Sequence, residues 1–141
     1  MPPSMNLRRV MQLEPTSCGI ACVATVGRLT HGRVLGAARG IFGWDKTQRT
    51  YYTNFEQLKK LLSSFGIAVG RRINKSDWAA VPDLAIAAIN HRRTRNDVEY
   101  WHWVVFQRIN DDFFVLDPRS KREVRRDFGK MRLHAYLPLK T

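Results

Sequence analysis

The stretch that decides the fold is WHWVVFQRINDDFFVLDP, residues 101–118. Its two halves are rich in aromatic and β-branched residues, as is typical of strands. Between them lies Asn110-Asp111-Asp112, a combination that favours a tight hairpin turn. The stretch therefore predicts an antiparallel hairpin, and LHAYLPL at 133–139 predicts one more strand near the C-terminus.

The length of the hairpin loop decides which side chains meet. With a two-residue loop, Asn110-Asp111, His102 and Asp117 become a diagonal pair on one face of neighbouring strands, within reach of a hydrogen bond. A three-residue loop would put them on opposite faces unless a bulge restored the alternation. The two arrangements remain open at this point.

Two strong helical patterns precede these strands. NFEQLKKLLSSFG, residues 54–66, has apolar residues at helical spacing, with a capping asparagine first and a glycine just past the end. An apolar helix is expected from Cys18 to about Leu29, with Thr16 or Ser17 as its N-cap. Such a helix packs against a second layer.

Weaker patterns fill the rest of the chain. A short second helix is expected from Val34 to Arg39, closed by Gly40, followed by a loop over 43–53. A short strand is expected over 67–69. LAIAAIN, residues 84–90, fits either a strand or a buried helical turn, because a continuous apolar run carries no period.

Helices followed by antiparallel strands predict an α+β architecture, with the leading helix packed on the sheet. No repeat or Gly/Ser linker divides the 141 residues, so we expect one domain spanning 1–141. Residues 1–11 are expected to form a loose arm. No apolar run approaches the roughly 18 residues of a membrane span, and we see no secretory signal, so a cytoplasmic protein is expected.

The charge is strongly positive, with 24 Lys and Arg against 12 Asp and Glu, a formal net charge of +12. This balance favours an anionic partner, whether nucleic acid, an acidic protein or a membrane surface. No zinc-finger spacing, RNA-binding aromatic motif or phosphate-binding glycine loop supports a nucleic-acid site. A solvated basic surface explains the charge equally well.

The only two cysteines, Cys18 and Cys22, stand four residues apart in a predicted helix, where a disulfide between them is strained. We expect two free thiols. Cys18 lies in the first helical turn, where free N–H groups and the helix dipole favour a thiolate, and Gly19 leaves room for a substrate backbone. Taken alone, a cysteine at a helix start is more often a small buried residue, as we expect of Cys22.

The remaining histidines, His31, His91 and His134, have no partners at metal-ligand spacing and are expected at the surface or in loops. No motif for a metal or cofactor site is found.

Three blocks together resemble a known family. They are QLEPTSCGIACVATV at 12–26, HWVVF at 102–106 and FFVLDP at 113–118. In order and spacing they are similar to the signature blocks of the bacteriocin-processing peptidases, papain-like domains that remove double-glycine leader peptides. The resemblance extends from about Arg8 to Leu137.

This resemblance implies a papain-like cysteine peptidase without a cofactor that cleaves protein or peptide substrates after small residues such as Gly-Gly. Cys18 would be the nucleophile, His102 its base and Asp117 the residue that orients the imidazole. Gln12, six residues before the cysteine, would donate to the oxyanion.

Two departures bear on substrate choice. The family usually has an acidic residue just before the cysteine, where this chain has Ser17, and a glycine soon after the Asp-Pro pair, where this chain has residues 119–122, RSKR. Family domains often belong to an exporter, but these residues include no membrane helix and no nucleotide-binding loop. If the chain is complete, we therefore expect a peptidase that acts without an attached exporter.

Several functions remain open on this basis. The domain could be a stand-alone leader peptidase, or an antibacterial toxin or effector with a matching immunity protein, which would act in a target cell's cytoplasm. A non-catalytic binding module that uses the basic surface, or a deamidase or acyltransferase with the same triad, are the alternatives.

Overall fold

Three helices precede a four-stranded antiparallel sheet in the computed structural model, which describes residues 7–140. The helices are α1 (Cys18–Gly27), α2 (His31–Phe42) and α3 (Phe55–Ser64). The strands are β1 (Leu84–Arg93), β2 (Glu99–Ile109), β3 (Asp112–Leu116) and β4 (Leu133–Pro138). They pair in the order β3-β2-β1-β4, with every pair antiparallel. The predicted α+β class is confirmed.

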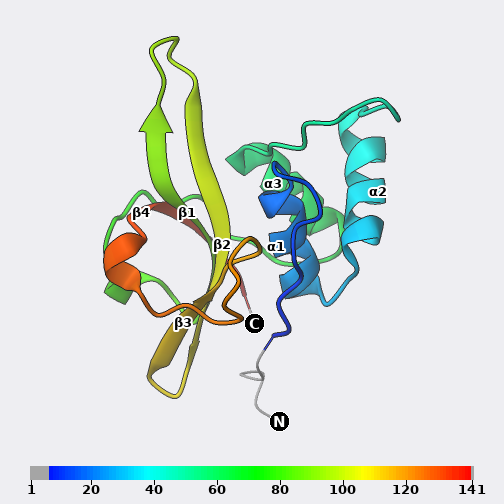
Figure 1. Cartoon of the computed structure of the whole chain (residues 1–141). Helices are drawn as coiled ribbons and strands as arrows, with labels where there is room; N and C mark the ends of the chain where they lie inside the picture. Colours follow the sequence, from blue (N-terminus) through cyan, green and yellow to red (C-terminus); the bar gives the residue numbers. More distant parts are fainter. Residues whose placement is uncertain (1–6, 141) are drawn as a thin grey trace.

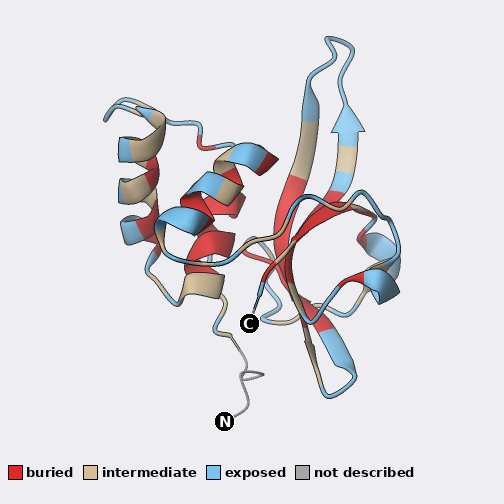
Figure 2. Ribbon diagram, turned by 180° about the vertical axis from the view of Figure 1, so that it is seen from behind, coloured by how far each residue is buried: buried red, intermediate tan, exposed pale blue. Residues whose placement is uncertain are grey.

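The helices gather on one side of the sheet, with α1 beside β2 (Figure 1). Buried residues concentrate where the helices face the strands (Figure 2). This main core joins Ile20 and Val23 of α1 with Leu61 of α3 and with Trp103 and Val105 of β2. Alternate residues of the strands face opposite sides of a sheet, and here both sides are covered.

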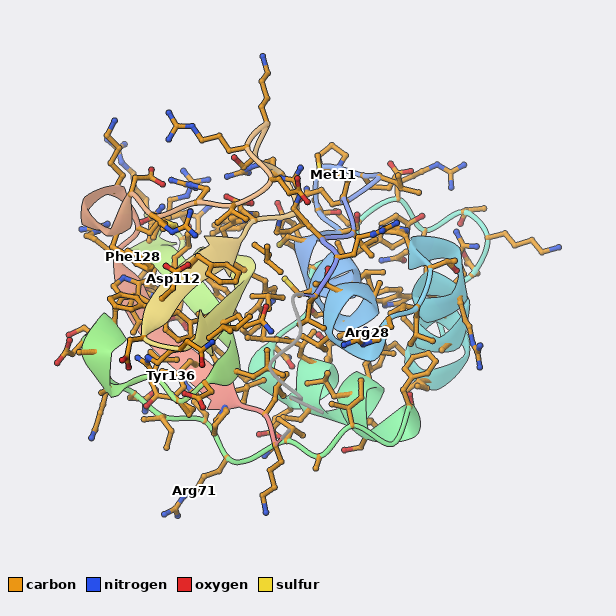
Figure 3. All side chains as sticks on the ribbon, turned by 90° about the horizontal axis from the view of Figure 1, so that it is seen from below. Met11, Arg28, Arg71, Asp112, Phe128 and Tyr136 are labelled. Carbon is orange, nitrogen blue, oxygen red and sulfur yellow. The ribbon has the colours of Figure 1, made fainter. Side chains whose placement is uncertain are left out.

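A second core lies on the other face of the sheet. It contains Ala87, Phe106 and Met131, packed against the half-buried Trp78 and Phe128 of two short 3₁₀ turns. Figure 3 shows Phe128 on the side of the sheet away from the helices. Because β1 is buried on both faces from Ala85 to Ile89, that part of its sequence shows no alternation, and only the structure identifies residues 84–90 as a strand.

The first helix begins at Cys18 as predicted, but without a side-chain cap. Ser17 occupies the N-cap position, and its hydroxyl instead bonds Glu14 and His31. The helix ends at Gly27, two residues before the expected end, because Arg28 takes a left-handed conformation with φ of 56°.

The second helix is longer than predicted. The side chain of Thr30 accepts a hydrogen bond from the Arg33 backbone N–H at 3.1 Å, so Thr30 caps a helix that begins at His31, three residues before the expected start at Val34. Gly40, expected to close the helix, lies within it, and Gly43 closes it with φ of 70°. His31 is consequently buried at the start of α2, which corrects its expected surface position.

The third helix confirms its sequence signals. Asn54 accepts a hydrogen bond from the Gln57 backbone N–H, and the Gln57 side chain accepts one from the Asn54 backbone N–H. This reciprocal capping box fixes the start of the helix. Gly66 follows its end with φ of 73°. The short strand expected over 67–69 is reduced to a single bridge between Val69 and Leu139.

The hairpin between β2 and β3 has a two-residue loop. Ile109 stands opposite Asp112, and Asn110 and Asp111 both have positive φ, 50° and 68°. This is the geometry whose twist suits a tight hairpin. The predicted hairpin is confirmed, and the structure decides between the two loop lengths in favour of the one that puts His102 and Asp117 on one face of the sheet.

Residues 7–11 form no helix or strand, yet they are held against the body of the protein. The Val10 backbone N–H donates to the Thr25 hydroxyl at 2.9 Å, and Leu7 and Val10 pack on the main core. The Arg9 guanidinium donates to backbone carbonyls of the segment that follows β3. Residues 1–6 of the expected arm lie outside the described residues.

Candidate active site

Cys18 is the first residue of α1 and is 7% exposed. The end of the helix presents it to β2, the neighbouring strand that carries His102. Cys22, one turn later, is completely buried. Burial raises the pKa of Cys22 well above its usual value, and the negative charges of Cys18 and Asp117 raise it further. Both cysteines are free thiols, as expected.

His102 lies between a thiol and a carboxylate. Its Nε2 atom is 2.6 Å from Asp117 Oδ1, and its side chain also hydrogen-bonds that of Cys18. Because Asp117 engages Nε2, Nδ1 is the ring nitrogen that remains for the thiol. Burial lowers the pKa of His102, but the hydrogen bonds and negative charges of Asp117 and Cys18 outweigh burial and raise it to about 9. The site therefore favours an imidazolium.

Asp117 follows β3 directly and is 3% exposed. Its Oδ1 accepts hydrogen bonds from His102 and from the Arg119 backbone N–H, the latter at 2.9 Å. Its Oδ2 accepts a hydrogen bond from Arg125 at 2.8 Å. Burial raises the pKa of Asp117, but these donors, His102 first, hold it far below its usual value. The carboxylate stays ionised and fixed against the imidazole.

Arg125 was missed by the sequence reasoning, which counted it only among the 24 Lys and Arg of a basic chain. Its half-buried guanidinium bonds Asp117 with one nitrogen and Asp127 with two others, at 3.0 and 2.6 Å. The backbone N–H and carbonyl of Arg125 also pair with Val115 of β3. The available signal was the Arg125–Asp127 spacing, since residues two apart in an extended segment share a side.

Gln12 lies in the segment that crosses the end of β3, where its backbone N–H donates to the Pro118 carbonyl at 3.0 Å. Its side-chain Nε2 donates to the carbonyls of Glu14 and Pro15 at 2.9 and 3.0 Å. Those bonds turn the amide toward the loop that precedes Cys18. To donate to an oxyanion at Cys18, the amide would have to break at least one of these two hydrogen bonds.

Gly19 has a different role from the expected one. A Cβ atom at this position would lie 2.2 Å from Thr53 Oγ1 and 3.0 Å from Trp103 Cδ1. Both neighbours are buried, and the Trp103 ring nitrogen donates to the Thr53 carbonyl at 3.0 Å. The missing side chain therefore allows α1 to pack on β2 and is not a space for substrate.

Two cavities of about 310 Å³ each meet at Cys18, Tyr52, Tyr100 and Trp101. We call the first the Trp103 cavity; only this one is lined by Thr53, Asn54, Gln57, Val98, Glu99 and Trp103. We call the second the His102 cavity; only this one is lined by Pro15, Asn90, Arg92, His102 and Arg119. A peptide chain crossing Cys18 thus has room on both sides of the thiol.

Neither cavity is lined by His31, His91 or His134. His31 Nε2 bonds the Ser17 hydroxyl at 3.1 Å, and burial lowers the pKa of His31. His91 bonds Glu99 at 2.7 Å and stacks on His134, both half-buried. Within residues 7–140, no three His, Cys, Asp or Glu side chains are grouped as metal ligands. No helix in that range is long and apolar enough to cross a bilayer.

The family model described as the peptidase C39 family matches residues 6–128, a range that includes Cys18, His102 and Asp117. No curated protein matches the chain.

Proposed function

The chain belongs to the peptidase C39 family, the bacteriocin-processing family of the papain-like cysteine peptidase clan, and we propose that it hydrolyses peptide bonds with Cys18 as its nucleophile. His102 is the base and Asp117 the residue that orients His102. The observation that carries the proposal is the hydrogen-bonded series from the Cys18 side chain through His102 to the buried Asp117 carboxylate. A family of peptidases implies a protein or peptide substrate.

Acylation begins with the Cys18 thiolate and the His102 imidazolium. The sulfur attacks the carbonyl carbon of the scissile bond and forms a tetrahedral oxyanion. As this collapses, the C–N bond breaks, and the imidazolium gives its proton to the leaving amine. The products are a thioester on Cys18, a free amine and a neutral His102.

Deacylation uses the same groups. Neutral His102 takes a proton from water, the hydroxyl attacks the thioester carbonyl, and the Cys18 thiolate leaves with the imidazolium restored. Asp117 does not change its protonation; it holds Nε2 so that Nδ1 faces the reacting atoms. Backbone N–H groups in the first turn of α1 have no acceptor within the helix and stabilise the oxyanion, together with Gln12 if its amide turns toward the site.

We propose cleavage after Gly-Gly, in keeping with the family resemblance of the blocks around Cys18 and His102. The aromatic walls that both cavities share, Tyr52, Tyr100 and Trp101, favour small residues next to the scissile bond. The protein is then either a processing peptidase for double-glycine precursors or a toxin that cuts a target-cell protein. A neighbouring precursor gene supports the first, and a neighbouring immunity gene the second.

The test is cleavage in a complex mixture. Wild-type protein, Cys18→Ala and Cys22→Ala are each incubated with a cell lysate, and new N-termini are identified by mass spectrometry. We expect new N-termini preceded by Gly-Gly with wild type and Cys22→Ala, and none with Cys18→Ala. Cleavage after other residues would overturn the Gly-Gly preference alone. Cys18-dependent deamidation or acyl transfer without new N-termini would overturn the peptidase proposal in favour of another reaction on the same triad.

A further inference from the structure

The two cavities at Cys18 differ sharply in charge. The His102 cavity is lined by Arg92 and Arg119 and by no acidic residue. The Trp103 cavity is lined by Glu99 and by no lysine or arginine. The reacting thiol therefore lies between a basic side and a side with one carboxylate.

A β-bulge puts Arg92 at this position. Ile89 pairs with His102 and Arg92 pairs with Tyr100, so β1 supplies two residues, Asn90 and His91, opposite one residue of β2. Without the bulge, His91 would stand opposite Tyr100. Bulges redirect side chains in this way and are frequent beside active sites. Here the bulge turns Arg92 to the face of the sheet that carries His102.

The bulge is built into the sheet. Asn90 has φ of 54°, a left-handed conformation that asparagine tolerates well. Its backbone N–H donates to the Arg132 carbonyl at 2.8 Å, and its side-chain oxygen accepts from the Arg132 backbone N–H at 2.9 Å. The Arg92 guanidinium lies 5.4 Å from the centre of the Tyr100 ring, which forms part of the cavity wall.

Arg119 reaches the cavity from the other side. It follows Asp117 and Pro118, and its backbone N–H is fixed by the Asp117 carboxylate. Within residues 7–140, neither Arg92 nor Arg119 forms an ion pair with a carboxylate. Nearby arginines differ, because Arg125 and Arg126 are both bonded to aspartates. Two exposed guanidinium groups thus face a cavity that contains no acidic side chain.

The chemistry of the proposed reaction assigns this cavity to one side of the scissile bond. His102 must hand its proton to the leaving amine, so the amine lies against the imidazole. His102 lines only the cavity with the two arginines. The part of the substrate that remains on Cys18 then extends into the Trp103 cavity.

We propose that the His102 cavity is a subsite for a carboxylate on the leaving side of the scissile bond. This inference rests on the proposed peptidase function. Its substrates are peptides with Asp or Glu among the first two or three residues after the cleaved bond. A guanidinium matches a carboxylate through paired hydrogen bonds. The Trp103 cavity is lined by no lysine or arginine, and its one carboxylate, Glu99, is paired with His91 and Arg93.

The experiment compares matched peptides. Quenched fluorescent peptides carry Gly-Gly followed by Glu-Glu or by Gln-Gln, and a third carries Glu-Glu before Gly-Gly. We expect kcat/KM about tenfold higher for Glu-Glu than for Gln-Gln after the cleaved bond, a modest factor because exposed ion pairs are partly screened. Glu-Glu before the bond should give no gain. In Arg92→Gln/Arg119→Gln the ratio of Glu-Glu to Gln-Gln should fall to about one, and in Arg92→Glu a Lys-Lys peptide should become preferred over Glu-Glu.

Arg71→Gln is the matched control, because it removes the same charge at a distant position. Figure 3 shows Arg71 at the opposite edge of the molecule from Met11. The residue after Met11, Gln12, bonds Pro118, which directly precedes Arg119. It should keep the wild-type ratio. Equal cleavage of the Glu-Glu and Gln-Gln peptides, or an Arg71→Gln effect as large as that of the double variant, would overturn the subsite.

A binding assay separates the subsite from the peptidase function. Fluorescence polarisation measures binding of labelled Glu-Glu and Gln-Gln peptides to Cys18→Ala protein, with and without the two arginine substitutions. Arginine-dependent binding of the acidic peptide without cleavage by wild type would overturn the peptidase proposal, and the cavity would then be a carboxylate-binding site with no leaving side. Cleavage without an acidic preference would overturn the subsite alone, and so would the absence of any acidic preference in binding.

Discussion

Replacing Arg125 with methionine should slow the reaction without removing any group that contacts substrate. Arg125 donates the hydrogen bond to Asp117 Oδ2, whereas His102 and the Arg119 backbone N–H both bond Oδ1. The substitution leaves Oδ2 of a 3% exposed carboxylate without this donor. The carboxylate then has more freedom to rotate, and the imidazole loses part of its orientation.

The size of the effect follows from the bond that is lost. A hydrogen bond to a charged group contributes about 1.5 to 3 kcal/mol. If the whole loss appears in the transition state, kcat falls between about 10-fold and 150-fold, since 1.4 kcal/mol corresponds to about a factor of ten. We expect a fall near the lower limit, with KM within about twofold of wild type. The free energy of unfolding should fall by about the same amount, lowering Tm by about 5 to 9 °C.

The pH profile distinguishes positioning from general destabilisation. Arg125 is one of the donors that hold the pKa of Asp117 below its usual value, so its loss should move that pKa upward. The acidic limb of kcat, where Asp117 gains a proton, should shift to higher pH. Arg125→Lys should recover part of kcat, because an ammonium group cannot serve Asp117 and Asp127 as the guanidinium fork does.

Arg126→Met is the matched control, since Arg126 bonds Asp112 at the surface and not Asp117. Exposed pairs of this kind contribute little to stability, and kcat should stay at the wild-type value. Steady-state kinetics across pH and thermal unfolding measure all three variants. Wild-type kcat and an unshifted acidic limb in folded Arg125→Met would refute the reasoning, as would an equal loss in Arg126→Met.

Three further outcomes are expected. Gly19→Ala should lower the free energy of unfolding by about 1 to 3 kcal/mol in chemical denaturation, because its Cβ would lie 2.2 Å from Thr53 Oγ1 and 3.0 Å from Trp103 Cδ1 of β2. An unchanged midpoint would show that α1 can move away from these two neighbours. Gln12→Ala should lower kcat by about 10²-fold if the amide turns to the oxyanion, whereas an effect confined to thermal stability would assign Gln12 to its bonds with Glu14 and Pro15. Both kcat and the free energy of unfolding should decline as pH rises through about 9, because the pKa of His102 is raised to about 9 in the folded protein. The stabilisation by protonated His102 is complete only below 6.5, the pKa of the unfolded state. A free energy of unfolding that stays level from pH 7 to 10 in wild type would contradict a protonated His102.

Local signals determined the elements that could be predicted. The capping box at Asn54 and the turn residues Asn110 and Asp111 act over a few residues, so α3 and the hairpin follow directly from the sequence. The position of Asp117 relative to His102 then depends only on the strand register. Both members of the pair could therefore be placed once the loop length was assumed.

Tertiary contacts determined what could not be predicted. Arg125 contacts Asp117 because its segment pairs with Val115, and no local sequence pattern predicts that pairing. The bulge that turns Arg92 toward His102 depends on Asn90 bonding Arg132, which lies 42 residues further along the chain. From the sequence, Gly19 could equally leave room for a substrate. Only the structure shows that a Cβ atom at this position would meet Thr53 and Trp103, so that the glycine permits the contact with Trp103.

The central claim, that His102 activates the Cys18 thiol, is tested most directly by competitive alkylation. Iodoacetamide is added to folded protein near neutral pH, and the labelling rates of Cys18 and Cys22 are followed by mass spectrometry. Cys18 should react at least about tenfold faster, but Cys22 is completely buried, so that difference alone is not decisive. His102→Ala provides the decisive comparison, because it removes the imidazole while opening the site. We predict that it slows labelling of Cys18, whereas equal or faster labelling of Cys18 in the folded variant would contradict the claim.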